Sequence, residues 1–561
     1  MNIKIVLYLL GKLSCFLGAF YTVPFLVSLY YGDEGRGIFP ACIALCVLLG
    51  LLFTKYGHYN RYTELISNRD GILVTVLVWI MAAVLAAIPY AVSGRLDPVS
   101  AYFEAMSGLT TVGATVIADV EVWPKSLLFW RFWTHWLGGL GIIVIFLAIL
   151  PTISGSAVHL FDAESTGFEE GKLKPKLKST AQILFTIYVG ITVLTAVLLL
   201  AVGLSPYDAI CHAMTCIATG GFSNYNSSVA AFHNPWAELI LGLCMFTAGG
   251  NFSLYYNVFR KGPNLLLHDD EFRTYAGFIV VIGTLITLNL YLSGFDGSLL
   301  HSFRVAFYQT TSFTSTTGTV STDFEQWPAF SKLLLCLLYI TGGCAGSTAG
   351  GVKMCRIVVL FRGLRVDILH MLHPKTIRRV HYNGKVIRGK TMHMILSFFT
   401  IYVFTIGVTS LIVAATGTDV LTALTASASC MSSAGPGFGS IIGATGTYAP
   451  LPLAAKFVLT WNMVMGRLEL FVVLALLNRS FWRGTAAGKI QTVRKIEKYG
   501  GKPYIDCRRQ EEHEDLRIGV WKNHHEGGSA GGKSHLRPGG QTGGGGGGHP
   551  RCGPGSPAAS H

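Results

Sequence analysis

Four short strips of Thr, Ser, Ala and Gly lie between apolar stretches, and they carry the chemistry that this sequence can perform. They read TTVGATV at 110–116, IATGGFSN at 217–224, TSTTGTVSTDFEQWP at 314–328 and SSAGPGFGS at 432–440. Glycine permits positive φ angles and lets backbone carbonyl groups point inward. A ring of carbonyl groups can replace the hydration shell of a potassium ion. Four such strips that converge on one axis would form a cation pore.

A short helix is predicted directly before the first strip. Asp97 is a capping carboxylate, Pro98 is a first-turn proline, and about twelve helix-compatible residues follow. A helix of this length is too short to cross about 30 Å of hydrocarbon at about 1.5 Å per residue. It can enter the membrane and return, with the strip as its exit. Irregular backbone is tolerated at that depth where it lines a water-filled cavity.

The same pattern occurs four times along the chain. LSPYDAICHAMTCIATGGFSN repeats LDPVSAYFEAMSGLTTVGATV with an ungapped shift of 108 residues, and HSFRVAFYQTTSFTSTTGTVS and TDVLTALTASASCMSSAGPGFGS follow further along. An ordinary glycine-containing loop would explain one strip by itself. Four strips in register, each preceded by a short helix, indicate an internal repeat.

The composition is typical of a membrane protein that crosses the bilayer many times. The chain is 51% hydrophobic and only 13% charged, with a mean hydropathy of +0.47. A soluble domain has about 25% charged residues. Basic cytoplasmic loops explain the net charge of +14, so no nucleic-acid partner is expected. The 12 cysteines form no CxxC pair and are predicted to be small core residues.

Ten apolar stretches are predicted to span the membrane, and the first is read as a retained span, not a signal peptide. They lie near 3–31, 38–54, 71–92, 127–150, 181–203, 236–259, 275–293, 331–361, 393–416 and 452–478. The predicted parts are a helix pair at 1–54, pore repeats at 71–150, 181–260, 275–365 and 391–480, and a Gly-rich tail at 484–561. The composition of the tail predicts disorder.

Basic residues concentrate in loops that fall on one side of the predicted spans. The segment 353–390 carries ten Lys or Arg and a single acid, Asp367. KLKPKLK occupies 172–178, and the segment 55–69 is also basic. Cytoplasmic loops are enriched in Lys and Arg, so these loops are predicted to be cytoplasmic. The opposite loops are acidic, and an acidic outer face concentrates cations.

The four strips together resemble the TrkH/KtrB family of bacterial potassium transport subunits, and most closely its TrkH branch, over roughly residues 1–483. The resemblance implies a potassium-channel-like pseudo-tetramer made by one chain. The expected fold is therefore an all-α polytopic membrane protein with four repeats of helix, re-entrant pore helix, filter and helix, plus two N-terminal helices. The resemblance also implies potassium as the transported ion and the bacterial inner membrane as the location, and no cofactor bound by this chain is expected.

The resemblance places potassium on the four filter strips. The implied positions are Thr110, Thr111, Val112, Gly113, Thr219, Gly220, Gly221, Thr316, Thr317, Gly318, Thr319, Ser433, Ala434, Gly435 and Pro436. Each filter has one secure glycine, and Gly220 and Gly221 compete for that place in the second. Such filters are expected to discriminate less sharply than the TVGYG filter of tetrameric potassium channels, admitting some rubidium and a sodium leak.

A glycine-rich stretch, ITGGCAGSTAGGVK at 340–353, interrupts the eighth apolar stretch. Each glycine costs a helix about 1 kcal/mol relative to alanine. The stretch resembles the intramembrane gate loop of this family, which implies Gly342, Gly343, Gly346, Ser347, Thr348, Gly350 and Gly351 as gate residues. Close helix packing through small residues is the alternative. A Walker A loop is rejected, because it requires GK followed by Ser or Thr and this stretch reads GGVKM.

Three basic residues, Arg131, His135 and Arg467, lie in predicted spans. An arginine in a span usually faces a partner or a cavity. The resemblance places Arg467 beside the gate loop as an electrostatic barrier. A structural pair with a carboxylate is the alternative, although Glu469 is two residues away and does not face Arg467 on a helix. Arg131 and His135 are interpreted as interface anchors and are given no role.

The sequence does not determine whether ion transport is passive or coupled to a gradient of another ion. Walker, phosphorylation and dinucleotide motifs do not occur in the sequence, so ion flow is expected to follow an electrochemical potential, and the chain is not expected to be an enzyme. Passive conduction and coupling to protons or sodium remain alternatives, with Glu104 and Glu469 as candidate proton carriers. Cys211 and His212 are the nearest approach to a nucleophile and base, and they are interpreted as packing residues.

The resemblance also implies partners. It predicts a homodimer in the lipid membrane and a cytosolic ring of TrkA-like subunits that bind NAD(H) or ATP and control the gate. The basic loops could dock such an acidic or nucleotide-binding partner.

Overall fold

The computed structural model describes residues 3–57, 67–141, 177–295, 297–375 and 378–482, together with two short strands near the C-terminus. The chain divides into one unit, Met1–Arg483, and a second, Gly484–His561. In the second unit, β3 (Pro503–Tyr504) pairs antiparallel with β4 (Gly519–Val520). The rest of the predicted tail lies outside the described residues, and its disorder stays a prediction.

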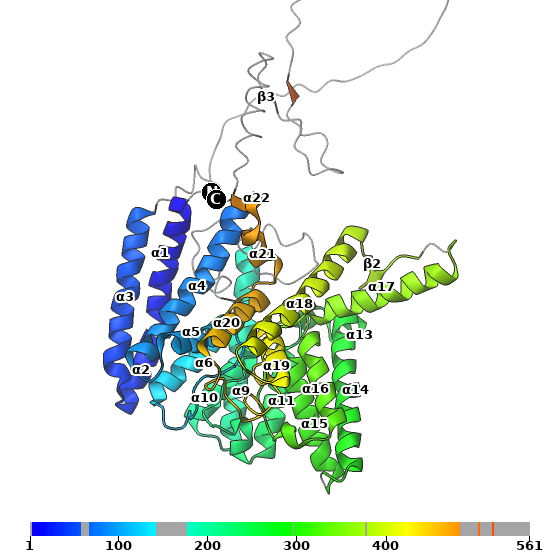
Figure 1. Ribbon diagram of the computed structural model, residues 1–561, viewed down its shortest axis with the longest axis horizontal. Helices are drawn as coiled ribbons and strands as arrows, with labels where there is room; N and C mark the ends of the chain where they lie inside the picture. Colours follow the sequence, from blue (N-terminus) through cyan, green and yellow to red (C-terminus); the bar gives the residue numbers. More distant parts are fainter. Residues whose placement is uncertain are drawn as a thin grey trace, which may run out of the picture. The chain divides into compact units, whose positions relative to one another are not determined.

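The first unit is built from helices (Figure 1). Before residue 142 they are α1 (Ile3–Phe20), α2 (Thr22–Tyr31), α3 (Gly35–Tyr56), α4 (Asn68–Val92), α5 (Pro98–Leu109) and α6 (Lys125–Gly139). From 177 to 295 they are α9 (Leu177–Ala201), α10 (Pro206–Ile217), α11 (Pro235–Ala248), α12 (Phe252–Lys261), α13 (Asn264–His268) and α14 (Asp270–Leu292).

Long and short helices also follow one another from residue 299 to the end of this unit. The helices there are α15 (Leu299–Thr314), α16 (Ala329–Thr341), α17 (Met354–Leu372), α18 (Gly389–Ala415), α19 (Val420–Ser432), α20 (Leu453–Arg467), α21 (Phe471–Leu477) and α22 (Arg479–Trp482). Between α17 and α18, a hairpin of β1 (His381–Tyr382) and β2 (Lys385–Val386) follows the part of α17 that reaches out from the other helices (Figure 1).

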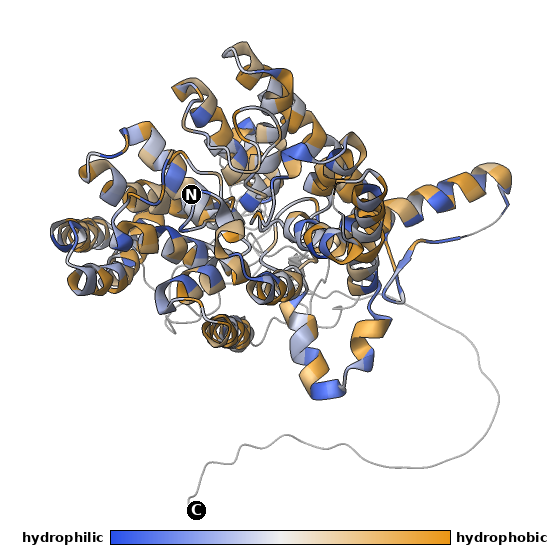
Figure 2. Ribbon diagram, turned by 90° about the horizontal axis from the view of Figure 1, so that it is seen from below, coloured by the Kyte–Doolittle hydropathy of each residue, from blue (hydrophilic) through white to orange (hydrophobic). Residues whose placement is uncertain are grey.

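Long apolar helices with exposed hydrophobic side chains mark the first unit as a membrane protein. Six described segments are long and apolar enough to cross a membrane, and eight are if each bent helix pair counts as one span. On α18, Phe404 and Leu411 are 70% and 73% exposed, which water would penalise and lipid would not. Figure 2 shows hydrophobic residues, in orange, along most of the helices.

Two of the ten predicted spans are sharply bent, which the sequence did not indicate, and a third is interrupted at the glycine-rich stretch, as predicted. The stretch 236–259 is α11 and α12, bent by 91°, and 452–478 is α20 and α21, bent by 117°. The stretch 331–361 is divided between α16 and α17 by the irregular residues 342–353. A fourth, 127–150, is helical up to Gly139, and its part beyond residue 141 lies outside the described residues.

Each of these helices ends for a local reason. After α11 come Gly249 and Gly250, and then Asn251 caps α12 by accepting hydrogen bonds from the N–H groups of Ser253 and Leu254. After α20, Glu469 adopts a left-handed φ of 51°, which cannot continue a right-handed helix. The helices α6, α11, α16 and α20 have 15, 14, 13 and 15 residues, so all four stop after a similar length.

Candidate functional site

Four short helices, α5, α10, α15 and α19, lead into the four strips. The first has the predicted 12 residues, Asp97 caps it by accepting from Val99 and Ser100, and Pro98 is in its first turn. Ser205 and Asp419 cap α10 and α19 in the same manner. Hydrogen bonds from Thr422 hold the pKa of the Asp419 carboxyl below its ordinary value. The predicted short helices are therefore present in the structure.

Each short helix ends in the same backbone motif. The residue after the helical turn is left-handed, with φ of 57° at Thr111, 54° at Thr219, 55° at Thr316 and 60° at Ser433. The next N–H group bonds back to a carbonyl five residues earlier, at 3.0, 2.9, 2.8 and 3.0 Å in the four repeats. This is the Schellman arrangement, which usually uses glycine at the left-handed position. Threonine there is strained, and such strain is typical of functional sites.

A glycine with positive φ follows two residues later in every strip. The φ angles are 80° at Gly113, 82° at Gly221, 78° at Gly318 and 87° at Gly435. Gly221 is thus the equivalent of Gly113, which resolves the competition with Gly220 that the sequence left open. We call residues 111–113, 219–221, 316–318 and 433–435 together the ring.

The four glycines show that the ring is closed. A Cβ atom added at Gly113 would lie within 3.0 Å of the Gly220 carbonyl oxygen, and one at Gly221 within 3.0 Å of the Thr317 oxygen. In the same way Gly318 faces the carbonyl of Ala434, and Gly435 faces that of Val112. Around the ring, the first strip therefore faces the second, the second faces the third, the third faces the fourth, and the fourth faces the first. A side chain at any of these glycines would press on the carbonyl of the next strip.

Backbone carbonyl groups at and just after the ring glycines accept hydrogen bonds from side chains of the surrounding protein. The Thr319 carbonyl accepts from Ser312 Oγ at 2.7 Å, and the Pro436 carbonyl accepts from the Tyr339 hydroxyl at 2.6 Å. The Gly435 carbonyl accepts from the Tyr448 hydroxyl at 2.9 Å. The fourth strip is therefore fixed by two tyrosines, neither of which the sequence analysis singled out. At the other end, Thr110 Oγ1 bonds to the Met106 carbonyl within its own helix.

Arg131 and His135 of α6 lie against the strips, so the interpretation of these residues as interface anchors was wrong. His135 is fully buried, bonds to Thr215 Oγ1 at 2.9 Å and occupies the place where a side chain at Gly220 would be. Arg131 pairs with Glu104 behind the first strip. Sequence reasoning missed both because an apolar segment does not reveal which of its faces meets the strips.

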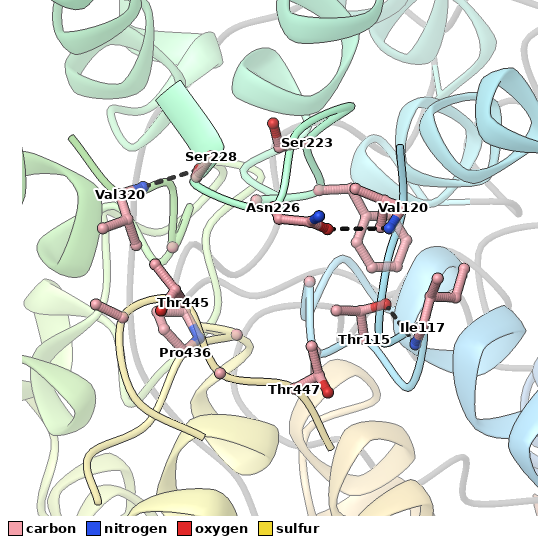
Figure 3. Close-up of a pocket in the computed structure, with 18 of the residues that line it drawn as sticks. Thr115, Ile117, Val120, Ser223, Asn226, Ser228, Val320, Pro436, Thr445 and Thr447 are labelled. Carbon is pink, nitrogen blue, oxygen red and sulfur yellow. Dashed lines mark hydrogen bonds between the residues drawn. The ribbon is translucent and has the colours of Figure 1, made fainter. Parts of the chain in front are cut away.

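A pocket lies against the four ring glycines. It is lined by residues of all four strips and by the segment 443–448 that follows the fourth (Figure 3). Cross-links between strips form its walls: Asn226 Oδ1 accepts from the Val120 N–H at 3.0 Å, and Ser228 Oγ accepts from the Val320 N–H at 3.1 Å. The pocket thus ends at the ring.

The residues 342–353 form an irregular segment, here called the central loop, at the other end of the ring. Gly342, Gly346 and Gly351 have φ of 69°, 74° and 77°, conformations that only glycine adopts readily. The Gly350 N–H donates to Thr316 Oγ1 at 2.8 Å. Because it touches the first ring residue of a strip, while the pocket is lined by the glycines, the loop and the pocket lie at opposite ends of the ring.

The other predicted loop residues connect the central loop to the neighbouring repeats. Thr348 Oγ1 bonds to the Ile217 carbonyl at 3.0 Å and the Ala248 carbonyl at 3.2 Å. A side chain at Gly343 would meet the Gly249 carbonyl, and one at Gly350 would meet the Ser432 carbonyl. Ser347 Oγ bonds within the loop, to the Cys344 carbonyl at 2.6 Å. The loop is held at the ends of the surrounding helices.

Arg467, the last residue of α20, lies beside the central loop as the sequence analysis expected. Its guanidinium donates to the carbonyl groups of Thr348 at 3.1 Å, Gly138 at 2.5 Å and Gly139 at 2.7 Å. It also reaches Thr111 Oγ1 at 3.4 Å. A fixed positive charge is therefore present directly below the first strip. It lies at the C-terminal end of α6, where the helix dipole favours cations.

Two acids near the central loop have defined partners. Glu469 pairs with Arg356 of α17 at 2.5 Å, so the structure supplies the partner for Glu469 that the sequence did not identify. Glu271, at the start of α14, is 3% exposed, and its Oε1 accepts the N–H groups of Ala345 at 2.6 Å and Cys355 at 3.0 Å. Its Oε2 accepts from the Tyr382 hydroxyl of β1 at 3.2 Å. Glu271 thus joins the loop and the first turn of α17 to the hairpin.

These features define a polytopic membrane transport protein. The chain matches the family model TrkH, described as a cation transport protein, over residues 41–292 and 297–481. It therefore belongs to the TrkH family.

Relatives of known function cover nearly the same part of the chain. The Trk system potassium uptake protein TrkH of Vibrio parahaemolyticus is 33% identical over 495 residues, which are 86% of this chain and 100% of that protein. TrkG of Escherichia coli is 30% identical over 493 residues, with 86% and 99% covered. The crystal structure of the potassium transporter TrkH from V. parahaemolyticus aligns with a TM-score of 0.78 at 31% identity, covering 86% of this chain and 100% of that chain.

Proposed function

We propose that this protein takes up potassium through a central pore in the bacterial inner membrane. The closed ring is the observation that carries the proposal, because four strained strips facing one another's carbonyl groups have the arrangement that replaces a hydration shell. The names of the relatives as potassium uptake proteins support potassium as the ion. The positions 110–113, 219–221, 316–319 and 433–436 form the filter in this proposal.

Ion flux in proteoliposomes tests the proposal, with rubidium uptake measured against competing sodium. Gly113→Ser places a side chain against the Gly220 carbonyl and is expected to lower rubidium uptake or admit sodium. Gly94→Ser is a matched control, since Gly94 also has a positive φ, 69°, but lies in open space. Equal effects of the two substitutions, or an intact protein that does not prefer rubidium, would contradict the filter.

The central loop and Arg467 form the gate in this proposal. The loop lies below the first residues of the strips, and the guanidinium adds a positive charge on the same path. A cation that leaves the ring must pass both. Opening then requires the loop to move. This movement is expected at the seven predicted gate positions of the loop, which are Gly342, Gly343, Gly346, Ser347, Thr348, Gly350 and Gly351.

A cytosolic nucleotide-binding partner of the TrkA type is proposed to control the gate, and two copies of the chain are proposed to form a homodimer. The loops predicted to be cytoplasmic include an exposed basic set at 375–390, formed by Lys375, Arg378, Arg379, Lys385, Arg388 and Lys390. This surface is suited to an acidic partner. Arg378→Glu with Arg379→Glu is expected to abolish binding of the purified partner, while flux of the chain alone stays unchanged.

Proton- or sodium-coupled symport through the same pore is the alternative. Glu104 and Glu469 were its candidate proton carriers, and each is engaged in an ion pair with an arginine, at 2.8 Å for Arg131 and 2.5 Å for Arg356. Passive conduction is therefore favoured. Rubidium uptake at zero proton and sodium gradient would support conduction, and uptake that requires either gradient would support symport.

A further inference from the structure

A buried ion pair stands behind the first two strips of the ring. Arg131 Nε lies 2.8 Å from Glu104 Oε1, and the two side chains are 1% and 0% exposed. Charges at such depth are tolerated when they are paired and when their remaining donors and acceptors are hydrogen-bonded. The partners of these remaining groups therefore show what the pair holds in place.

The carboxylate holds the end of the first strip. Glu104 Oε2 accepts the Val116 N–H at 2.8 Å, and the Thr115 hydroxyl donates to the same carboxylate at 3.0 Å. These residues come two and three positions after the ring glycine Gly113. Glu104 itself belongs to α5, so the carboxylate ties the strip back to the short helix that precedes it.

The guanidinium binds the first strip to the second. Arg131 Nη2 donates to Thr115 Oγ1 at 3.1 Å, and Nη1 donates to the Ser223 carbonyl at 3.2 Å. Ser223 comes two positions after the ring glycine Gly221. The guanidinium also lies over the Phe222 ring, 4.0 Å from its centre. One rigid planar group thus fixes two neighbouring strips at once.

The other repeats have no charge at the position of Glu104. Counting nine residues back from each ring glycine gives Glu104, His212, Gln309 and Ala426. His212 Nε2 bonds to Ser223 Oγ at 3.2 Å, and Gln309 Nε2 is 3.5 Å from the Thr319 carbonyl. In the fourth repeat the neighbouring Thr425 bonds to Phe438 instead. The strongest support is therefore at the junction between the first two strips.

We propose that the Arg131–Glu104 pair sets the separation of the first two strips and thereby determines how sharply the ring discriminates potassium from sodium. The inference rests on the proposed function, since it presupposes that the ring is the filter. Neither side chain contacts a ring carbonyl, so both are positioning residues. Selectivity of a carbonyl ring depends on the size of the cavity and on the field of its oxygens, and both change when two strips separate.

Arg131→Lys in the full-length chain is the decisive variant. Lysine keeps the buried charge balanced, but it has no planar fork and cannot bond to Glu104, Thr115 and Ser223 together. In proteoliposomes we expect the ratio of rubidium to sodium uptake to fall about five-fold, with rubidium uptake itself changed less than about two-fold. Loss of folding alone would lower both ions equally and leave the ratio unchanged.

Two further variants keep the test decisive. Thr115→Val removes the hydroxyl that both charged groups share, and it is expected to lower the same ratio without disturbing the pair. Arg95→Lys is the matched control, because Arg95 pairs with Glu34 at the same 2.8 Å but with 35% and 40% exposure.

The outcomes separate the two proposals. An intact protein that prefers rubidium, together with Arg131→Lys and Thr115→Val variants that keep its ratio, would overturn the inference and leave the filter standing. An intact protein without any preference would overturn the proposed function itself. If Arg131→Lys aggregates in gel filtration, the ratio measured for Thr115→Val decides.

Discussion

The ring and the central loop are in direct contact, yet they are held in place in different ways. The ring repeats one backbone motif four times, with a left-handed Thr or Ser, a hydrogen bond back over five residues and a glycine of positive φ in each strip. The central loop belongs to the third repeat and is fixed by single side chains, above all Arg467, Glu271 and Thr348.

This difference suits the two regions to different roles. A repeated backbone motif gives four equivalent carbonyl positions and resists movement, because each strip is packed against the next. A loop held by a few side-chain hydrogen bonds can exchange one arrangement for another at a cost of a few bonds, each worth about 1 kcal/mol. The ring is therefore suited to selection and the loop to gating.

The largest expected effect is on the ring. Gly221→Ala and Gly318→Ala should each reduce rubidium uptake by about a hundred-fold, since the added methyl group overlaps a carbonyl at roughly 1–3 kcal/mol and the positive φ costs roughly 1–2 kcal/mol more. Uptake into proteoliposomes is the measurement. Gly262→Ala, at a φ of 100° in open space, is the control. If Gly221 and Gly318 differ by more than the experimental scatter, the four strips are not equivalent.

The next effect is on the barrier below the ring. Arg467→Gln should raise rubidium flux of the chain alone by about ten-fold, because it removes a positive charge that lies 3.4 Å from Thr111 Oγ1, beside the proposed ion path. Arg467→Lys keeps the charge and should leave the flux close to that of the intact chain. A drop in flux for Arg467→Gln would assign Arg467 a purely structural role at the carbonyl end of α6.

A smaller effect is expected where the hairpin meets the loop. Glu271→Gln replaces an acceptor of three hydrogen bonds by a group with one acceptor oxygen, so the loop ends should loosen by about 1–3 kcal/mol. Faster hydrogen exchange at the amides of Ala345 and Cys355 is the readout. Glu238→Gln, a buried acid paired with Arg304 away from the loop, should not change that exchange. Unchanged exchange in Glu271→Gln would show that Glu271 does not hold the loop.

The smallest effect concerns the single bond between ring and loop. Thr316→Val keeps the β-branched shape but removes the oxygen that accepts the Gly350 N–H, and flux should change by about five-fold for about 1 kcal/mol. Thr219→Val serves as its counterpart, because the Thr219 hydroxyl bonds to its own neighbour Ala218. A larger change at Thr219 than at Thr316 would mean that the hydroxyl groups act through the ions and not through the loop.

The sequence by itself determined the parts that depend on local rules. Asp97 before Pro98 predicts a helix start, twelve residues limit the helix to a re-entrant length, and a Thr-Gly strip repeated four times predicts a ring. The family resemblance placed residues 342–351 and Arg467 next to the filter strips, and the structure brings both into contact with the ring, while their role as a gate stays a proposal. The predictions of the short helices and their strips succeeded because capping, helix length and glycine conformations are properties of neighbouring residues.

The tertiary structure alone decided which distant residues support the ring and the central loop. Arg131, His135, Tyr448 and Glu271 come from helices and loops whose sequences are apolar or unremarkable, and their roles depend on which face meets a strip. The breaks after α11 and α20 were missed for the same reason: hydropathy reports that a segment is apolar, and not where its axis bends. Burial and hydrogen bonding across the chain exist only once the repeats have closed around one axis.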